Sequence, residues 1–152
     1  DWSSDVCSSD LSGIGYAGVH QVADVNGDGT ADLISGNRLS GAGSYSYAGQ
    51  VRIFAGSVVE GVKSVVQAVD QDSAGTVISG ESASEYLGTG VAAYDFDLDG
   101  VDDVFVSAPG YDSSKGRWGY FPGVVSSGPA SSPVVWYTGA SAGNSLGAAI
   151  TR

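Results

Sequence analysis

The stretch that decides the fold runs from residue 93 to residue 106 and reads AYDFDLDGVDDVFV. A matching stretch, VADVNGDGTADLIS, occupies residues 22–35. Aligning Asp95 with Asp24 gives an offset of 95 − 24 = 71 residues. In both stretches acidic or amide side chains alternate with other residues up to a glycine, and apolar residues follow. An acidic loop repeated in this way indicates a repeat protein rather than an isolated turn.

Both loops carry the residue types that calcium requires. Calcium is a hard cation that takes about 6–8 oxygen ligands. In a D-x-[DN]-x-D-G-x-x-D loop, the side chains at positions 1, 3 and 5 converge because glycine at position 6 permits a sharp turn. Position 7 offers its backbone carbonyl, and position 9 closes the cage. We therefore predict two Ca²⁺ sites, with the ligands Asp24, Asn26, Asp28, the Thr30 carbonyl and Asp32 in the first acidic loop (residues 24–32), and Asp95, Asp97, Asp99, the Val101 carbonyl and Asp103 in the second acidic loop (residues 95–103).

Other interpretations of these loops fit less well. An EF-hand needs a bidentate glutamate at position 12 and flanking helices, but position 12 is Ser35 in the first loop and Val106 in the second. Magnesium rarely loses its water for a cage made only of protein ligands. The remaining alternative is a pair of solvated Asx-turns without an ion. Two copies at equivalent repeat positions favour the metal.

The repeat extends beyond the acidic loops. Gly80 and Gly139 precede matching Leu-Gly pairs at residues 87–88 and 146–147, with an offset of 139 − 80 = 59 residues. In the second copy, apolar and aromatic runs bounded by Gly and Ser predict four strands, roughly over residues 89–95, 103–107, 117–122 and 133–137. Residues 61–69 are rich in β-branched side chains, which favours strand or loop over helix.

Four short strands per unit are typical of a β-propeller blade. We therefore predict an all-β fold, a partial β-propeller with about two four-stranded blades and the start of a third. The corresponding repeats cover roughly residues 12–80, 81–139 and 140–152.

The charge balance narrows the class of partner. The chain has 17 acidic and 6 basic residues, and nucleic-acid binding needs clustered Lys and Arg to neutralise phosphates, so we expect no nucleic-acid partner. Three acidic residues lie within residues 1–11 and seven are predicted ligands, which leaves 17 − 3 − 7 = 7 against six basic residues. Most of the excess of acidic over basic residues therefore consists of predicted calcium ligands. No apolar run approaches the ~20 residues of a membrane helix, so we expect no membrane insertion.

Residues 1–11, DWSSDVCSSDL, resemble a translated short-read sequencing adapter, and the chain contains no Met. We therefore treat them as an artefact outside the fold; the alternative is a genuine Ser-rich loop. Cys7 is the only cysteine of the chain and belongs to this segment. Without it, we expect no disulfide, thiol nucleophile or thiolate metal site.

With the loops and the repeat established, residues 12–152 resemble the FG-GAP repeats of integrin-alpha-like β-propellers. Leu87-Gly88 stands at the "FG" position, and residues 107–110, Ser-Ala-Pro-Gly, stand at the "GAP" position on the other side of the second loop. The first copy has Ser35-Gly36-Asn37 in place of "GAP", and the third keeps only Leu146-Gly147. The resemblance implies calcium hairpins between the first two strands of certain blades. Two blades and the start of a third are then part of a ring that needs about 4–8 blades.

The resemblance also implies a function. It predicts an extracellular or cell-surface module with structural calcium, which acts in adhesion or binds an unknown extracellular protein or glycan. The alternative is a non-catalytic propeller region of a secreted hydrolase whose catalytic domain lies outside this chain. A third possibility is a purely structural spacer. The residues offer no base paired with a nucleophile, so we predict no catalytic residues.

Several weaker signals have structural interpretations. Residues 13–18 fit G-x-G-x-x-G and residues 143–147 fit G-x-S-x-G, but neither has the strand–turn–helix context of a dinucleotide or nucleophile site. We predict that His20 lies in a strand. We also predict that Trp118, Tyr120 and Phe121 belong to a blade core rather than to a ligand platform.

Overall fold

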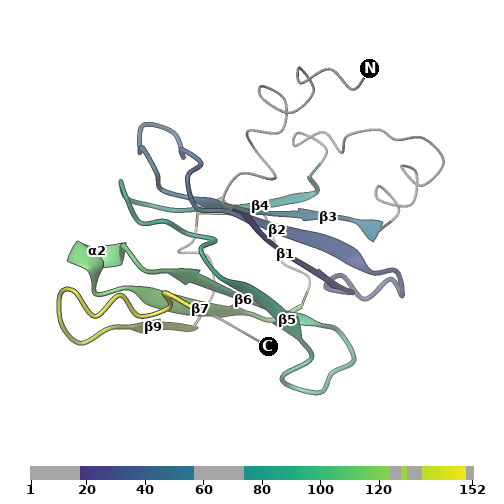
Figure 1. Ribbon diagram of the computed structural model, residues 1–152. Coiled ribbons are helices and arrows are strands. Elements are labelled where there is room, and N and C mark those ends of the chain that lie inside the picture. Colours follow the sequence, from purple (N-terminus) through teal and green to yellow (C-terminus); the bar gives the residue numbers. More distant parts are fainter. Residues whose placement is uncertain (1–17, 57–73, 124–127, 130–134, 150–152) are drawn as a thin grey trace, which may run out of the picture.

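The computed structural model describes residues 18–56, 74–123, 128–129 and 135–149. These residues form two β-sheets that lie one above the other as two layers (Figure 1). The first sheet contains, in spatial order, β1 (Gly18–Ala23), β2 (Asp32–Asn37), β3 (Gln50–Phe54), β4 (Thr76–Ser79) and β8 (Gly128–Pro129). The second contains β5 (Val91–Tyr94), β6 (Asp103–Ala108), β7 (Arg117–Phe121) and β9 (Val135–Thr138).

Strands β1–β4 form one four-stranded antiparallel unit, blade 1, and β5, β6, β7 and β9 form a second, blade 2. In each blade, strands that follow one another along the chain are neighbours in the sheet, as in a propeller blade. The predicted all-β fold of two four-stranded blades is confirmed. His20 lies in β1, as predicted.

The strand boundaries differ in detail from the prediction. The strand predicted over residues 89–95 runs only from Val91 to Tyr94, because Asp95 already belongs to the acidic loop. The two-residue strand β8 was not predicted; it pairs in parallel with β4, with Ile78 opposite Gly128. This pairing joins positions 50 residues apart (128 − 78), so it could not be predicted from a local sequence pattern. The predictions for residues 1–11 and 61–69 lie outside the described residues.

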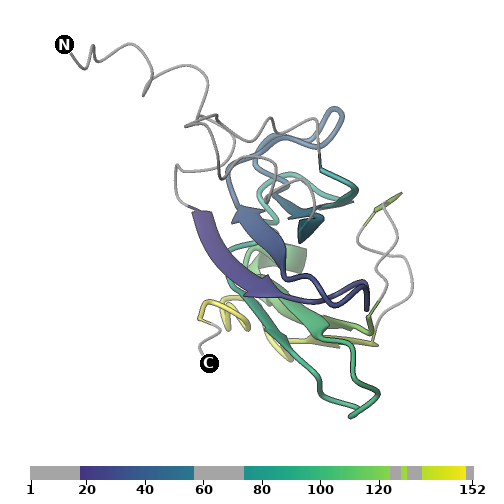
Figure 2. The same cartoon turned by 90° about the vertical axis from the view of Figure 1, so that its right-hand side faces the viewer.

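The core lies between the two blades. Alternating residues of a strand point to opposite faces, and blade 1 directs Ile34, Val51 and Ile78 towards blade 2. Blade 2 directs Val104 and Val106 towards blade 1. All five side chains are at most 1% exposed and belong to one apolar cluster. Figure 2 shows the blades from the side. The two sheets therefore stabilise each other chiefly by apolar burial.

The repeats are connected by a joint that occurs twice. Gly49, before β3, forms a parallel bridge with Leu87, and Gly116, before β7, forms one with Leu146. The amide of Leu87 donates to the Ala48 carbonyl at 2.9 Å. At the second joint, the Leu146 amide donates to the Lys115 carbonyl at 3.0 Å. Residues 140–149 therefore pack against blade 2 in the same way as the start of the second repeat packs against blade 1.

Glycine is required at these joints. Gly49 has φ +83°, and a Cβ atom there would lie only 2.1 Å from the Leu87 carbonyl oxygen. Gly147, in the G-x-S-x-G match, has φ +85°, and its Cβ atom would lie 2.7 Å from the Ser107 side chain. Both conformations favour glycine. The glycine at position 147 is therefore explained by the repeat joint.

A buried ion pair ties blade 2 to the segment that precedes it. Arg117 donates through Nε to Glu85 Oε1 at 2.9 Å, and its Nη2 also donates to Glu85 and, at 3.0 Å, to Glu81. Arg117 is 4% exposed and Glu85 is fully buried. The guanidinium lies between the rings of Tyr111 and Trp136, 3.9 and 4.0 Å from their centroids. Each charge is therefore paired, as burial requires.

Tyr111 begins α2 (Tyr111–Ser114), a single short turn between β6 and β7. Residues 112–114 all have positive φ, between 45° and 61°. These values lie in the left-handed region, which only brief segments of L-residues adopt. The turn closes with the Gly116 amide donating to the Tyr111 carbonyl at 3.0 Å. It thereby leads the chain from the Ser-Ala-Pro-Gly segment into β7.

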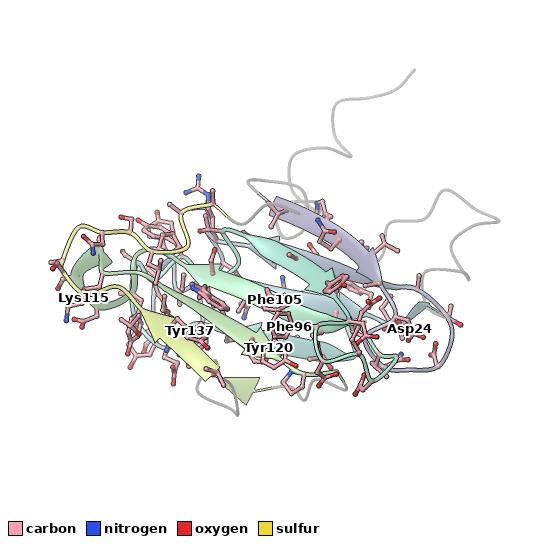
Figure 3. All side chains as sticks on the ribbon, turned by 90° about the horizontal axis from the view of Figure 1, so that it is seen from below. Asp24, Phe96, Phe105, Lys115, Tyr120 and Tyr137 are labelled. Atoms are coloured by element: carbon pink, nitrogen blue, oxygen red, sulfur yellow. The ribbon has the colours of Figure 1, made fainter. Side chains whose placement is uncertain are left out.

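The face of blade 2 that points away from blade 1 carries aromatic side chains. Phe105, Trp118 and Tyr120 are half-buried there, and Tyr137 is exposed. The rings form a continuous series in which Trp118 stacks on Tyr137 with centroids 4.4 Å apart and Phe105 contacts Tyr120 at 5.3 Å; three of these residues are labelled in Figure 3. The core prediction is confirmed for Phe121, which is 4% exposed. It is wrong for Trp118 and Tyr120, because strand alternation turns them to the opposite face.

Candidate metal centre

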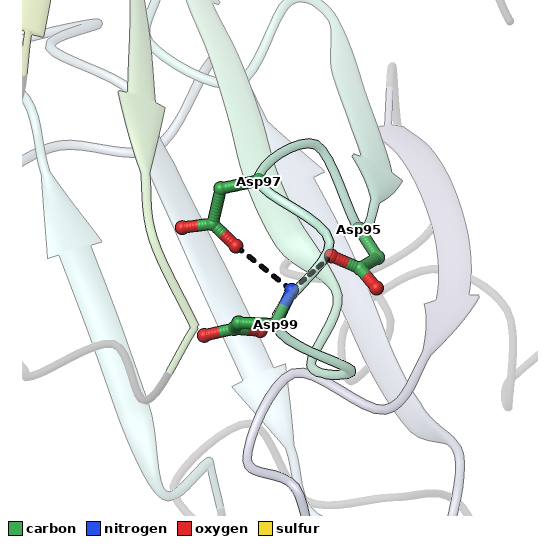
Figure 4. A group of neighbouring side chains, drawn as sticks. All are labelled: Asp95, Asp97 and Asp99. Atoms are coloured by element: carbon green, nitrogen blue, oxygen red, sulfur yellow. Dashed lines mark hydrogen bonds between the residues drawn. The ribbon is translucent and has the colours of Figure 1, made fainter.

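The second acidic loop joins β5 to β6 and gathers three carboxylates. Oxygen atoms of Asp95, Asp97 and Asp99 all lie within 4.8 Å of one another. Figure 4 shows the three side chains around the loop. Asp95 is half-buried, whereas the other two are exposed. In the part of the chain that the structure describes, no other group of three Asp, Glu, His or Cys side chains comes this close. The group offers several charged oxygens to one point in space.

Backbone amides hold these carboxylates in place. The Asp99 amide donates to Asp95 Oδ1 at 3.1 Å and to Asp97 Oδ1 at 3.2 Å. The Gly100 amide donates to Asp95 Oδ2 at 3.1 Å, and the Val101 amide donates to Asp99 Oδ1 at 2.8 Å. Hydrogen bonds from backbone amides to a carboxylate are charge-assisted. The loop therefore orients its acidic side chains through its own backbone.

The first acidic loop joins β1 to β2 and repeats this scheme. Asp24 occupies the place of Asp95, Asn26 that of Asp97, and Asp28 that of Asp99. The corresponding bonds run from the amides of Asp28, Gly29 and Thr30 to Asp24, Asn26 and Asp28, with lengths between 2.7 and 3.2 Å. The two loops are thus equivalent in geometry as well as in sequence. They lie at the same end of the two sheets (Figure 1).

Left-handed backbone conformations bend both loops at the same two positions. Position 6 is Gly29, with φ +81°, and Gly100, with φ +93°. Position 4 is Gly27, with φ +73°, in the first loop, but Leu98, with φ +64°, in the second. A leucine in this region is strained, and Leu98 is also 80% exposed. The loop geometry, rather than packing, determines this conformation.

The position-9 aspartates have a role that the ligand prediction did not include. Asp32 and Asp103 are fully buried. Asp103 accepts the Phe96 amide at 2.8 Å and the Gly123 amide, just beyond β7, at 3.1 Å. Asp32 accepts the Val25 amide at 3.2 Å and the Gly56 amide, just beyond β3, at 2.8 Å. Each carboxylate therefore fastens its loop to the third strand of its blade.

Asp103 consequently lies outside the group formed by Asp95, Asp97 and Asp99. The structure brings together three of the four carboxylates predicted for the second site. Val101 and Thr30, the predicted carbonyl ligands, stand at position 7, where their amides close the loops. Their role as ligands stays a prediction.

Burial, hydrogen bonds and neighbouring charges have opposing effects on the pKa of Asp32. Burial raises the pKa of Asp32, the amides of Gly56 and Val25 lower it, and the carboxylates of Asp28 and Asp24 raise it again. The net shift is upward, so the charged form is disfavoured. A cation in the loop would act in the opposite direction, because it favours the charged form of nearby carboxylates.

Tyr120 is a neighbour of the second loop that the sequence pattern did not reveal. Its hydroxyl donates to Asp97 Oδ2 at 3.4 Å. Burial, followed by the carboxylates of Asp103 and Asp97, raises the pKa of Tyr120 to about 12. The hydroxyl therefore stays protonated at neutral pH. Ile53 occupies the equivalent position of blade 1, because it pairs with Ile34 as Tyr120 pairs with Phe105.

The first loop has its own distinguishing contact. The Asn26 side-chain amide donates to Asp32 Oδ1 at 3.3 Å. A carboxylate, as at Asp97, cannot make this bond because it has no donor. The first loop therefore has one charge fewer among positions 1, 3 and 5, and its position-3 side chain is partly engaged with position 9.

The donor chemistry of both loops suits a hard cation. Carboxylate, amide and carbonyl oxygens are the ligands of Ca²⁺ and Mg²⁺, whereas softer metals favour sulfur and imidazole.

Among the described residues, no helix is long and apolar enough to cross a membrane.

Comparison with known proteins places these loops in a family. The FG-GAP repeat family matches residues 21–54 and 87–127, and each segment contains one acidic loop with its flanking strands. Phosphatidylinositol-glycan-specific phospholipase D from Bos taurus is 33% identical to the chain in an alignment of 96 residues, and the match covers 61% of this chain. The match spans only 11% of the length of that relative. These two segments of the chain are FG-GAP repeats.

Proposed function

We propose that the chain is a calcium-binding β-propeller module of an extracellular or cell-surface protein. In this proposal calcium is structural, and the blades present a surface to an extracellular protein or glycan in adhesion or binding. The observation that carries it is the group formed by Asp95, Asp97 and Asp99, in a loop whose hydrogen bonds recur in the first repeat.

Electrostatic repulsion supports a bound cation. Two unit charges 4 Å apart repel by about 1 kcal/mol at the dielectric constant of water, and by more where the site is shielded. Three carboxylates within 4.8 Å of one another bear this cost for each pair. A divalent cation between them replaces repulsion by attraction. Calcium suits the site better than magnesium, because it accepts irregular cages of protein oxygens.

The expected affinity of the loops supports the proposed extracellular location. Extracellular calcium modules have dissociation constants of roughly 10⁻⁴–10⁻³ M, and we expect the same range for these loops. Asp97 and Asp99 are exposed. Such sites are filled where free calcium is at millimolar concentration and are empty in a resting cytoplasm.

The second candidate function is a non-catalytic propeller region of a secreted hydrolase. The similarity to a phosphatidylinositol-glycan-specific phospholipase D favours it. The two candidates agree on the role of the loops and differ only in the domain that the blades accompany. We propose that this chain contributes no catalytic residue in either case. Incubation with a protein held by a phosphatidylinositol-glycan anchor then releases none of it, and release by the isolated chain would contradict this.

Thermal melting with and without calcium tests the proposal. A ligand that binds only the folded state stabilises it by about 2.7 kcal/mol at a hundredfold excess over the dissociation constant. We expect calcium to raise the melting temperature of the chain, and Asp97→Ala to reduce this rise. Asp112→Ala is the matched control, because Asp112 is an exposed acid outside both loops, paired with Lys115. Equal melting temperatures in calcium and in chelator would overturn the proposal.

A further inference from the structure

Asp102 is an acidic residue of the second loop that no ligand scheme uses. It stands at position 8, between the predicted ligands Val101 and Asp103. The equivalent residue of the first loop is Ala31. The loop scheme itself therefore does not require a carboxylate at this position.

The contacts of Asp102 reach across to the first loop. Its amide donates to the Asp24 carbonyl at 2.9 Å, and its Oδ2 atom accepts the Asp24 amide at 3.1 Å. The two residues are 78 positions apart in the chain. Both backbone polar groups of Asp24 are thus satisfied by one residue of the other repeat. Figure 3 labels Asp24 of the first loop and Phe96 of the second.

Asp24 is the residue that organises the first loop. Its carboxylate accepts the amides of Gly27, Asp28 and Gly29 at 2.8–3.2 Å. A shift of the Asp24 backbone would therefore move the carboxylate on which these three amides converge. Asp102 holds the backbone of Asp24, and the carboxylate of Asp24 in turn holds the first acidic loop.

A second contact joins the loops one residue earlier. A Cβ atom at Gly27 would lie 3.1 Å from Val101 Cγ2, and one at Gly123 would lie 2.5 Å from Val101 Cγ1. Val101 is thus packed between the first loop and the end of β7. Residues 101–103 therefore contain two predicted ligands of the second site together with the contacts to the first.

We propose that Asp102 is a positioning residue that couples the two cation sites, so that filling either site tightens the other. The inference rests on the proposed function, since it requires that the loops bind calcium. Closing the second loop around an ion fixes residues 101–103, and these fix the Asp24 backbone in its binding position. The same link works in reverse, because a coupling free energy is shared equally by both sites. Repulsion between two bound ions opposes the effect, and solvent and salt screen that repulsion.

Calcium titration of the complete chain measures the coupling. Calorimetry gives the affinity of the first site when the second is intact and when Asp95→Ala has disabled it. We expect the first site to bind roughly fivefold more tightly in the presence of the intact second site, a value at the low end of typical couplings. In Asp102→Ala, which copies Ala31, the ratio falls to about one.

Two further variants separate the hydrogen bond from the charge. Asp102→Asn keeps an oxygen that can accept the Asp24 amide, so we expect it to retain most of the coupling. Asp112→Ala removes an equal charge elsewhere and leaves the coupling unchanged. If Asp102→Asn loses the coupling as fully as Asp102→Ala, charge rather than the hydrogen bond is responsible and the inference is overturned.

A measurement without metal supplies an independent check. In metal-free protein, amide hydrogen exchange at Gly27, Asp28 and Gly29 becomes faster in Asp102→Ala than in the unaltered chain. Unchanged exchange would overturn the positioning role. If two ions bind independently in every variant, the coupling fails and the proposed function stands. If no calcium binds at all, the proposed function itself fails.

Discussion

Blade 1 and blade 2 have the same strand register, and their acidic loops share four equivalent hydrogen bonds, yet their equivalent faces differ. Ile34 pairs with Ile53 in blade 1, and Phe105 pairs with Tyr120 at the same place in blade 2. The blade 1 residues are at most 6% exposed, because blade 2 covers them. The aromatic residues of blade 2 are half-buried among themselves. The repeat therefore conserves backbone geometry, while the neighbour of each blade determines its side chains.

A second difference lies at the start of the third strand. Gln50 begins β3 and Arg117 begins β7 at equivalent register positions. Gln50 accepts a hydrogen bond from Ser40 at 2.8 Å and donates one to Ser79 at 3.2 Å. Arg117 instead forms a buried ion pair with Glu85. At this position blade 1 forms neutral hydrogen bonds, whereas blade 2 forms a buried ion pair.

We expect the largest loss of stability when the residue of blade 1 replaces that of blade 2 at this position. Arg117→Gln gives blade 2 the residue of blade 1 and leaves the carboxylate of Glu85 buried without its cation. Breaking a buried pair in this way costs about 3–5 kcal/mol. Denaturant unfolding measures the loss. Lys115→Ala, which removes an exposed pair with Asp112, is the control and costs about 1 kcal/mol or less.

The double variant Arg117→Gln with Glu85→Gln sharpens the test. It removes both charges, so we expect it to be more stable than Arg117→Gln alone. If Arg117→Gln costs no more than Lys115→Ala, the buried pair does not distinguish the blades.

The next effect concerns the equivalent faces. Ile34→Ala opens a cavity between the blades and costs about 2–5 kcal/mol. Phe105→Ala, at the same register position in blade 2, removes a half-exposed ring. We expect a smaller loss, of about 1 kcal/mol, because less area leaves the interior. Unfolding of the two variants under identical conditions gives the comparison, and equal losses would show that the faces are equally buried.

A smaller effect is expected at position 3 of the loops. Asn26→Asp gives the first loop the charge of the second but removes the donor to Asp32. We expect its calcium affinity to rise by roughly tenfold, or about 1.4 kcal/mol, since ligand charge tunes these sites. Asp97→Asn is the reciprocal variant and lowers the affinity of the second site. A fall in affinity in Asn26→Asp would mean that the bond to Asp32 matters more than charge.

The smallest effect belongs to Tyr120, which has no polar counterpart in blade 1. Tyr120→Phe removes one long hydrogen bond to Asp97, worth about 0.5 kcal/mol, so calcium affinity changes less than about threefold. Its pKa is raised in the folded state from 10.0 to about 12. The folded state thus keeps its proton longer, and this contribution to stability is present below pH 10 and lost as the pH rises through 12. Alkaline unfolding detects it, and in Tyr120→Phe this contribution is absent.

The acidic loops could be predicted because their geometry is local. Asp95 and Gly100 stand five residues apart, and the pattern itself sets the turn and the hydrogen bonds within it. The strands could be predicted for the same reason, since alternation and bounding glycines act over a few residues. The errors at the ends of β5 were of one or two residues.

The contacts between repeats could not be predicted. Arg117 and Glu85 are 32 residues apart, and Asp102 and Asp24 are 78 apart. Neither pair forms a pattern along the chain, because it depends on how one blade lies on the next. Trp118 and Tyr120 fit a core composition, but composition does not say which face of a strand is covered. The additional role of Asp103 also required the position of Gly123 beyond β7.

The glycine joints have a consequence for the order in which the protein acquires its structure. Leu87 and Leu146 each dock on a loop of the blade that precedes them. A ribosome releases the N-terminal blade first, at about 5–20 residues per second. During synthesis each repeat therefore emerges after the loop on which its leucine docks. A substitution at Gly49 would place a Cβ atom against the Leu87 carbonyl oxygen and so disturb the docking of the second repeat on blade 1.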